Sequence, residues 1–371
     1  MNRVYFNENC TKESLKSFLD SIEERSVIVF IAEKSVSSSE ELDQIIKNYS
    51  KTVVGGLFPY IIYGDIYLEK GVVAYGTNSD IEVADILNLS EGDEFIEQIE
   101  DFSDRDLKGE TNLLFVDGLS KNIGGLIDEV YNTMGDEFKF IGGGAGSLSF
   151  QQSPVIITPN GICQDCAVIL NLNMRSFIGV SHGWESISGP HQITESNKNV
   201  IIELDYRPAF DVYRETIKNR VGIEIDEENF FNIAKGFPFG INKLGSEKVV
   251  RDPIVVDGKS LVCVGDVVQN DYVDILKGNN NSLIEATHNS REKSLEEFQK
   301  HQESSSEVVS LFIDCVSRVL YLEDEFQREI DAVQIKDTPL FGILTLGEIA
   351  NSGDNYLEFY NKTSVFSILT K

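Results

Sequence analysis

The chain has 371 residues, with 61 Asp and Glu against 32 Lys and Arg, which gives a formal net charge of -29 at pH 7. This charge excludes nucleic acids and anionic membranes as partners, because both require a basic surface. The sequence has no apolar run of the roughly 20 residues that span a bilayer, and its start lacks the apolar core of a signal peptide. We therefore expect a cytoplasmic protein without membrane insertion.

Length and cysteine content add two expectations. A chain of 371 residues is long for one core, so two domains are predicted. The five cysteines are too few and too irregularly spaced for a disulfide framework, which agrees with a reducing compartment.

The N-terminal part of the chain predicts a strand, a helix and two further strands. Residues 26–32 are a largely apolar run typical of a buried strand. Residues 37–40 supply helix N-cap chemistry, and apolar side chains at helical spacing follow: Leu42, Ile45, Ile46 and Tyr49. Strands containing glycine are expected at 53–56 and 71–75.

A second unit repeats this order. Residues 112–116 predict a strand, and a helical stripe follows it through Ile123, Leu126, Ile127, Val130 and Met134. The next strand ends in the glycines of 142–146, and returning strands are expected at 154–158 and 166–172.

The third unit is weaker. A helix through Phe210, Tyr213 and Ile217 precedes strands at 237–240, 249–250 and 261–264. Residues 289–306 are polar, charged and rich in serine, and they predict an exposed helix followed by a linker.

The fourth unit contains two apolar strands, at 308–313 and 341–346. A helical stripe lies between them, formed by Leu322, Phe326, Ile330 and Val333 and stopped by Pro339. Gly347 ends the second strand in a turn that needs an unhindered backbone, and the last strands are expected within 357–369.

These recurring units predict an α/β fold of two related domains. Each domain would hold mixed β-sheets flanked by helices, built from internal strand-helix-strand-strand repeats. We place the division so that the domains comprise residues 1–205 and 206–371.

Charged and polar residues follow the two apolar strands of the fourth unit, and strand ends are where open α/β sheets bind ligands. Arg318 and Glu348 either form an internal ion pair or hold a small ligand, Arg318 by a carboxylate and Glu348 by an ammonium. In the second case the neutral hydrogen bonds come from Thr345, Asn361 and Thr363. Such a pocket suits an amino acid.

Other candidate sites have competing interpretations. Cys315 beside Arg318 is either a thiolate for a cysteine-dependent hydrolase or transferase, or a small buried hydrophobe. The glycines of 142–146 suggest a phosphate cradle, but they lack the spacing and lysine of a P-loop and favour tight backbone packing.

Residues 163–166 form a Cys-x-x-Cys pair, which is either a metal or redox motif or a turn before a strand. His182 and His191 are either haem ligands or structural histidines.

Three motifs of the C-terminal half resemble those of the FIST family. They are the apolar strand ending in Cys-x-x-Arg at 312–318, the Gly-x-x-Thr-x-Gly-Glu-Ile element at 342–349 and the Asn-x-Thr sequence at 361–363. In the N-terminal half the resemblance includes 142–146, 181–184 and 207–213. The chain thus resembles a FIST sensory protein, with an N-terminal and a C-terminal FIST domain.

The resemblance implies a non-enzymatic sensor in bacterial signal transduction that binds a small ligand. Amino acids are suggested as ligands, and haem is used by some members that sense nitric oxide. We expect no cofactor, with haem as the alternative. Because the resemblance extends over nearly the whole chain, we expect the signal to pass to a separate output protein. One departure affects the N-terminal half, where a Gly-x-Ser-Thr-x-Gly-Glu-like strand is replaced by apolar and aromatic residues at 55–66, with Asp65 in place of the acid.

Overall fold

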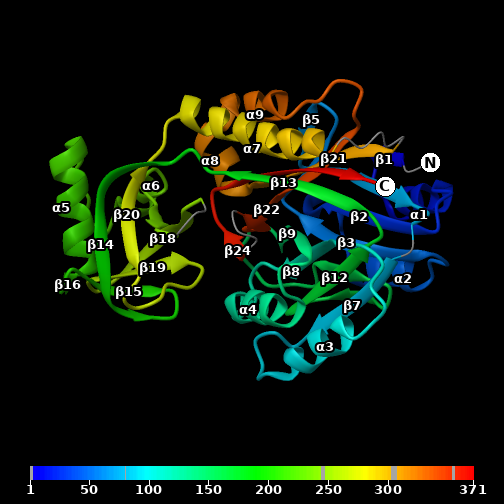
Figure 1. Cartoon of the computed structure of the whole chain (residues 1–371), viewed down its shortest axis with the longest axis horizontal. Coiled ribbons are helices and arrows are strands. Elements are labelled where there is room, and N and C mark those ends of the chain that lie inside the picture. Colours follow the sequence, from blue (N-terminus) through cyan, green and yellow to red (C-terminus); the bar gives the residue numbers. More distant parts are fainter. Residues whose placement is uncertain (1–2, 80, 244–246, 302–306, 353–355) are drawn as a thin grey trace.

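The predicted apolar runs form the central strands of a mixed α/β protein. The computed structural model describes all residues except 1–2, 80, 244–246, 302–306 and 353–355, and in the described residues the strands make four sheets. Helices flank these sheets (Figure 1). The predicted α/β class is therefore confirmed. That the strand-helix-strand-strand units are related repeats stays a prediction.

Three of the sheets have six strands each, and two of these combine strands from both halves of the chain. The first sheet has the order β1 (Arg3–Asn7), β6 (Val72–Thr77), β2 (Ser26–Ala32), β3 (Thr52–Phe58), β10 (Ile156–Thr158) and β11 (Gly161–Cys163). The second has the order β24 (Tyr356–Tyr360), β23 (Glu348–Ser352), β9 (Lys139–Ala145), β8 (Thr111–Asp117), β12 (Cys166–Leu172) and β7 (Ile81–Leu87). The third has the order β13 (Arg175–Ser181), β25 (Ser364–Thr370), β21 (Val308–Cys315), β22 (Leu340–Thr345), β4 (Tyr60–Tyr63) and β5 (Ile66–Leu68).

Each of these three sheets contains one parallel pair whose strands are joined through helices. The pairs are β2 with β3, β8 with β9, and β21 with β22. The remaining pairings are antiparallel, which gives the mixed character. The connecting helices are α2 (Ser39–Lys47) in the first case, α4 (Ile123–Met134) in the second, and α8 (Val316–Leu322) with α9 (Gln327–Ala332) in the third.

The fourth sheet builds a separate lobe from residues 185–277, at the left of Figure 1. Its order is β14 (Glu185–Asn197), β20 (Tyr272–Lys277), β17 (Phe239–Ile241), β18 (Val249–Asp257), β19 (Ser260–Val264), β15 (Val200–Leu204) and β16 (Arg207–Pro208), with α5 (Ala209–Val221) and α6 (Phe230–Ala234) beside it. We call residues 185–277 the lobe and the other described residues the body. Residues 205 and 206, where we divide the sequence, form the turn between β15 and β16, and the division stays a prediction.

Helices begin where the sequence provides caps. Ser38 precedes α2 and accepts a hydrogen bond from the backbone N–H of Glu41, which satisfies one of the free N–H groups of the first turn. Leu42 and Ile46 of α2 are buried against the sheet. The helices α1 (Lys12–Ser21) and α3 (Glu94–Ser103) bury similar apolar stripes.

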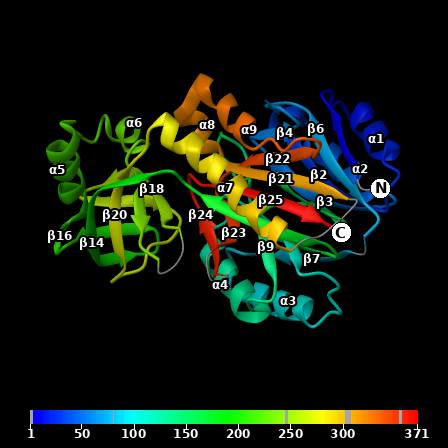
Figure 2. The ribbon, with the colours of Figure 1, turned by 45° about the horizontal axis from the view of Figure 1, so that its top comes forward.

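The helix α7 (Asn280–Lys300) differs from the exposed helix that we expect from its composition. The helix is confirmed, and it packs on the strands β13 and β25 of the body (Figure 2). Its residues Ser290 and Ser294 are fully buried. Ser294 donates to the carbonyl of Phe177 and accepts from the N–H of Ile368. Small serine side chains let the helix approach the sheet closely, so a polar sequence covers a buried face. The expected linker at 302–306 lies outside the described residues.

The predicted helical stripe after Arg318 is divided. The helix α8 ends at Leu322, and Glu323 adopts a positive φ of 49° before a short 3-10 turn and α9. Phe326 and Ile330 are still buried, so the apolar periodicity is correct although the backbone changes direction. In the described part of the chain, no helix combines the length and apolar character needed to cross a membrane.

Candidate functional site

The parallel strands β21 and β22 bring the predicted site residues together. Their register pairs Asp314 with Leu344 and Cys315 with Thr345, so both strands end at the same edge of the sheet. The chain then turns at Gly347, whose φ of 114° favours glycine, and a Cβ there would lie 2.2 Å from the ring of Phe359. The predicted turn is therefore confirmed.

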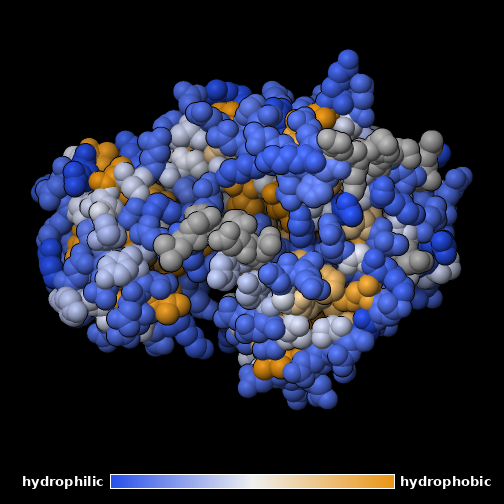
Figure 3. Space-filling view, in the orientation of Figure 1, coloured by the Kyte–Doolittle hydropathy of each residue, from blue (hydrophilic) through white to orange (hydrophobic). Residues whose placement is uncertain are grey.

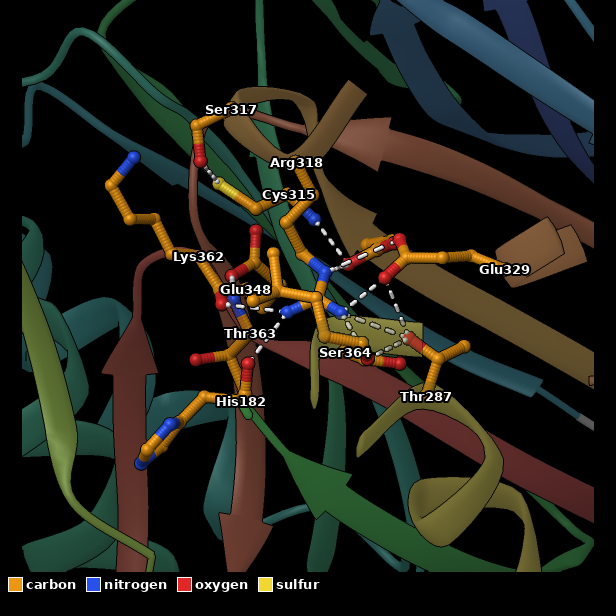
Figure 4. A network of polar contacts seen from close by, with 12 residues as sticks. His182, Thr287, Cys315, Ser317, Arg318, Glu329, Glu348, Lys362, Thr363 and Ser364 are labelled. Carbon is orange, nitrogen blue, oxygen red and sulfur yellow. Dashed lines mark hydrogen bonds and ion pairs between the residues drawn. The ribbon is translucent and has the colours of Figure 1, made fainter. Parts of the chain in front are cut away.

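Arg318 lies in α8 and is fully buried at this edge (Figure 4). Its Nε lies 3.1 Å from Asp314 Oδ1 and 3.3 Å from Glu329 Oε2, and its Nη2 also donates to Glu329 Oε1. The remaining acceptors are the carbonyl oxygens of His182 at 2.8 Å, Leu283 at 2.9 Å and Lys362 at 3.2 Å, together with Thr287 Oγ1 at 2.9 Å. Each of the three guanidinium nitrogens therefore donates to at least one protein acceptor.

Of the two arrangements considered for Arg318 and Glu348, the internal ion pair is not formed. The carboxylates that pair with Arg318 are those of Asp314 and Glu329. Burial and the nearby Glu329 raise the pKa of Asp314 well above its ordinary value. Burial therefore disfavours a second full negative charge beside Glu329 in this cluster.

Glu348 occupies the start of β23 and is fully buried. Its Oε1 accepts from Thr345 Oγ1 at 2.9 Å, and its Oε2 accepts from the backbone N–H of Thr363 at 3.1 Å. Burial raises the pKa of Glu348 to about 8, although these two hydrogen bonds favour the ionised form. At neutral pH this carboxyl group therefore carries a proton for most of the time.

Asn361 and Thr363 lie in the turn between β24 and β25. Asn361 Nδ2 donates to the carbonyl of Tyr360, and Thr363 Oγ1 donates to the carbonyl of Asn361. Asn361 Oδ1 is buried, and it has no hydrogen-bond partner among the described residues. Buried polar atoms are almost always satisfied, so such an atom requires an explanation.

Cys315 lies between Arg318 and Glu348 but lacks the features of a reactive thiol. Burial, with the added effect of Glu348, raises its pKa above the ordinary value. Its Sγ accepts from Ser317 Oγ at 3.0 Å. These surroundings favour the thiol over the thiolate on which a cysteine-dependent hydrolase or transferase would depend.

Lys362, which the sequence reasoning missed, connects the cluster to the lobe. Its Nζ lies 3.0 Å from Asp252 Oδ2 and donates to the carbonyl of Lys235, both in the lobe. Its own carbonyl accepts from Arg318 and from Trp184 Nε1. A single residue of the β24–β25 turn thus contacts the buried arginine and the lobe. Only the tertiary fold reveals this role, because no local pattern marks Lys362.

The junction between lobe and body is visible on the surface. Hydrophilic residues cover most of the face in Figure 3, and hydrophobic residues line the floor of a hollow between the two parts. A second hydrogen bond joins the lobe to the body, from Arg251 Nη1 of the lobe to the carbonyl of Phe359 at 2.9 Å.

The glycines of 142–146 serve close backbone packing, as the preferred interpretation predicts. Gly143 pairs with Glu348 in the register of β9 and β23. A Cβ on Gly143 would lie 2.7 Å from the carbonyl oxygen of Gly347 and 2.8 Å from Thr345 Cγ2. The glycines therefore let the N-terminal half approach the predicted site residues.

The other candidate motifs lie apart from this cluster. Cys163 and Cys166 are joined by a disulfide in the turn between β11 and β12, so the predicted turn is confirmed and the pair is also a covalent link. In the N-terminal half, the altered segment of residues 55–66 runs from β3 through β4 to the start of β5; β4 pairs with β22, and Asp65 lies in the turn between β4 and β5.

The two histidines considered for haem have protein partners. His182 is buried and its Nδ1 accepts from the backbone N–H of Trp184, and burial lowers its pKa to about 4. His191 lies in the lobe, where Ser188 and Asp205 contact its two ring nitrogens.

Comparison with known families covers most of the chain. The model described as FIST N domain matches residues 25–207, and the model described as FIST C domain matches residues 209–351. No curated protein matches the sequence. The chain therefore belongs to the FIST family, whose domains are small-ligand sensory domains in signal transduction.

Proposed function

We propose that this protein senses an amino acid or a similar small metabolite, and that the ligand binds through its ammonium group at Glu348 and Asn361. The observation that carries the proposal is the unpartnered Asn361 Oδ1, a buried acceptor in the turn that also holds Thr363 against Glu348. A carbonyl oxygen and a carboxyl group attract a donor-rich cation.

The charge state of the cluster supports the same ligand class. The donors of Arg318 already contact protein acceptors, so this residue positions the turn and the carboxylates instead of binding the ligand's carboxylate. Glu348 has no cationic partner in an ion pair among the described residues, and burial keeps its pKa near 8. An ammonium placed beside it would stabilise the ionised carboxylate. The remaining candidate residues, Cys315, Thr345 and Thr363, would line the same space.

Binding at this place would be coupled to the lobe. Asn361 is 3% exposed and Cys315 is 5% exposed, so a ligand can enter only when the turn between β24 and β25 moves. Lys362 of that turn is held by Asp252 and Lys235 of the lobe. A ligand that binds one arrangement of lobe and body better than another would shift the population between them.

The signal would then be read by a separate output protein in the cytoplasm. The acidic composition of the chain suggests that this partner presents a basic face.

The test is thermal unfolding of ligand-free protein against each of the twenty amino acids. A ligand at about a hundredfold over its dissociation constant stabilises by roughly 2.7 kcal/mol. We expect at least one amino acid to raise the melting temperature, and we expect Glu348→Gln and Asn361→Ala to abolish the increase. The control is Ser310→Ala, which removes another unpartnered buried atom at the opposite end of β21 and should leave the increase unchanged. No increase with any amino acid contradicts an amino acid as the ligand, and an increase that survives both variants contradicts the site.

A further inference from the structure

Three side chains of the lobe form a continuous relay of hydrogen bonds. Ser188 Oγ lies 3.0 Å from His191 Nε2, and His191 Nδ1 lies 2.7 Å from Asp205 Oδ2. Ser188 and His191 belong to β14, where the register with β20 shifts between them, and Asp205 begins the turn after β15. The three residues are brought together by the fold of the lobe and are separate from the cluster at Glu348.

The backbone fixes the carboxylate of this relay. Asp205 Oδ1 accepts from the N–H of Gln192 at 2.9 Å, while the N–H of Asp205 donates to the carbonyl of Gln192 at 3.0 Å. Asp205 itself has a positive φ of 52° in the tight turn that leads into β16. Both carboxylate oxygens of Asp205 therefore have hydrogen-bond partners, and the backbone contacts fix the orientation of the oxygen that faces His191.

This arrangement determines the proton positions on the imidazole. An ionised carboxylate only accepts hydrogen bonds, so His191 Nδ1 donates to Asp205. In the neutral ring Nε2 then has a free lone pair, and the hydroxyl of Ser188 donates to it. A serine hydroxyl hydrogen-bonded to an imidazole that is oriented by a carboxylate is the arrangement that activates serine as a nucleophile.

We propose that Ser188 accepts acyl groups from small uncharged carboxylic esters, with His191 as general base and Asp205 as positioning residue. Ser188 Oγ forms a bond to the ester carbonyl carbon while its proton passes to His191 Nε2. The tetrahedral intermediate then releases the alcohol, which leaves with the proton from His191. Water, deprotonated in the same way, cleaves the acyl-serine to the free acid and restores Ser188.

The surroundings determine the substrate class. Ser188 and His191 are partly exposed, and Gly189 and Pro190 between them are exposed, so the site is open to a small molecule. On the other side lies Asp274, because a Cβ on Gly189 would be 2.4 Å from Asp274 Oδ1. Lys248 Nζ lies 3.0 Å from Asp274 Oδ2, so the two charges balance each other and neither attracts an ionic substrate; we therefore assign uncharged esters.

The experiment mixes the full chain with p-nitrophenyl acetate, stops the reaction with acid within the first turnover, before the acyl-serine is hydrolysed, and locates acetyl groups by peptide mass spectrometry. Ser186 is the internal control, because it lies two residues earlier on β14, is exposed, and donates to Asp274 instead of an imidazole. We expect Ser188 to be acetylated at least about a hundredfold faster than Ser186, the contribution expected from a general base. Equal rates at the two serines, or acetylation of lysines alone, would overturn the proposal without any need for a variant.

Variants then separate nucleophilic activation from a structural role. His191→Gln should slow the acetylation of Ser188 by about a hundredfold or more, and Asp205→Asn should slow it to a lesser extent. Ser186→Ala should leave it unchanged. If His191→Gln melts like the parent protein yet Ser188 reacts as fast as before, the relay is only structural and the proposal fails.

Discussion

Replacement of Arg318 by methionine tests whether this residue is a structural element of the site. The change removes a buried guanidinium and leaves Glu329 and Asp314 without their cation. Loss of one partner of a buried ion pair costs about 3–5 kcal/mol. The buried carbonyls of His182, Leu283 and Lys362 also lose a donor, at about 1–3 kcal/mol for each one that stays unsatisfied. We therefore expect a loss of at least about 4 kcal/mol, a large part of the roughly 5–15 kcal/mol that stabilises a typical protein.

Urea unfolding provides the assay, with two probes. Circular dichroism follows the whole chain, and fluorescence follows Trp184, the single tryptophan, whose indole N–H donates to the carbonyl of Lys362 beside Arg318. Arg328→Met is the matched control, because Arg328 is an exposed arginine of the next helix, paired with Glu325, and its loss should change stability by no more than about 0.5 kcal/mol.

A second variant separates charge from packing. In Arg318→Met combined with Glu329→Gln, the unpaired carboxylate is gone, so the double variant should be more stable than the sum of the single changes predicts. A loss below about 1 kcal/mol for Arg318→Met alone would refute the reasoning. In that case the guanidinium would be dispensable to the fold and free to bind a ligand.

Three further changes have defined outcomes. Burial raises the pKa of Glu348 to about 8, so the folded protein keeps a proton that the unfolded chain releases above its ordinary pKa of 4.5. The free energy of unfolding should therefore fall as the pH rises between these two values. Glu348→Gln should make that fall shallower, which urea titrations at pH 5 and pH 8 measure. Lys362→Met should destabilise the protein by about 3 kcal/mol and speed hydrogen exchange in the lobe, since it removes a buried ammonium and leaves the partly buried Asp252 without its cation. Gly342→Ala should lower the melting temperature strongly, because its Cβ would lie 2.0 Å from the carbonyl oxygen of Phe312, and overpacking costs about 1–3 kcal/mol or more.

Matched controls exist for the last two changes. Lys243→Met removes an exposed ammonium that pairs with the partly buried Glu358 across the same junction, and it should change stability less than Lys362→Met. Gly236→Ala adds a Cβ whose nearest contacts are at 3.5 Å or more, so it should not destabilise. If either control matched its test variant, the corresponding argument would be wrong.

Strands and capped helices could be predicted from the sequence because local patterns determine them. The apolar run of β2 is buried along its whole length and has the predicted bounds, and α4 spans the predicted stripe from Ile123 to Met134. The burial of α7 cannot be predicted in this way, since hydrophobic periodicity does not register Ser290 and Ser294 as buried. The break at Glu323 was missed because the apolar spacing continues across it.

The position of the candidate site could be predicted from the sequence, but the interaction partners of its residues could not. Arg318 and Glu348 are both at the predicted strand ends, yet the partners of Arg318 depend on how α8 and α9 fold back, which places Glu329 beside it. Asp314 was a visible candidate, because it stands four residues before Arg318. The contacts of Lys362 join segments more than a hundred residues apart, and the pairing of His191 with Asp205 depends on a strand register. Sequence patterns do not encode such contacts locally.

The proton balance of binding tests the central claim most directly. If a ligand's ammonium pairs with Glu348, the carboxyl group must lose the proton that its pKa of about 8 retains at pH 7. Isothermal titration in two buffers with different ionisation enthalpies should therefore show close to one proton released per amino acid bound, and Glu348→Gln should release none. Binding without proton release in the parent protein would contradict the account.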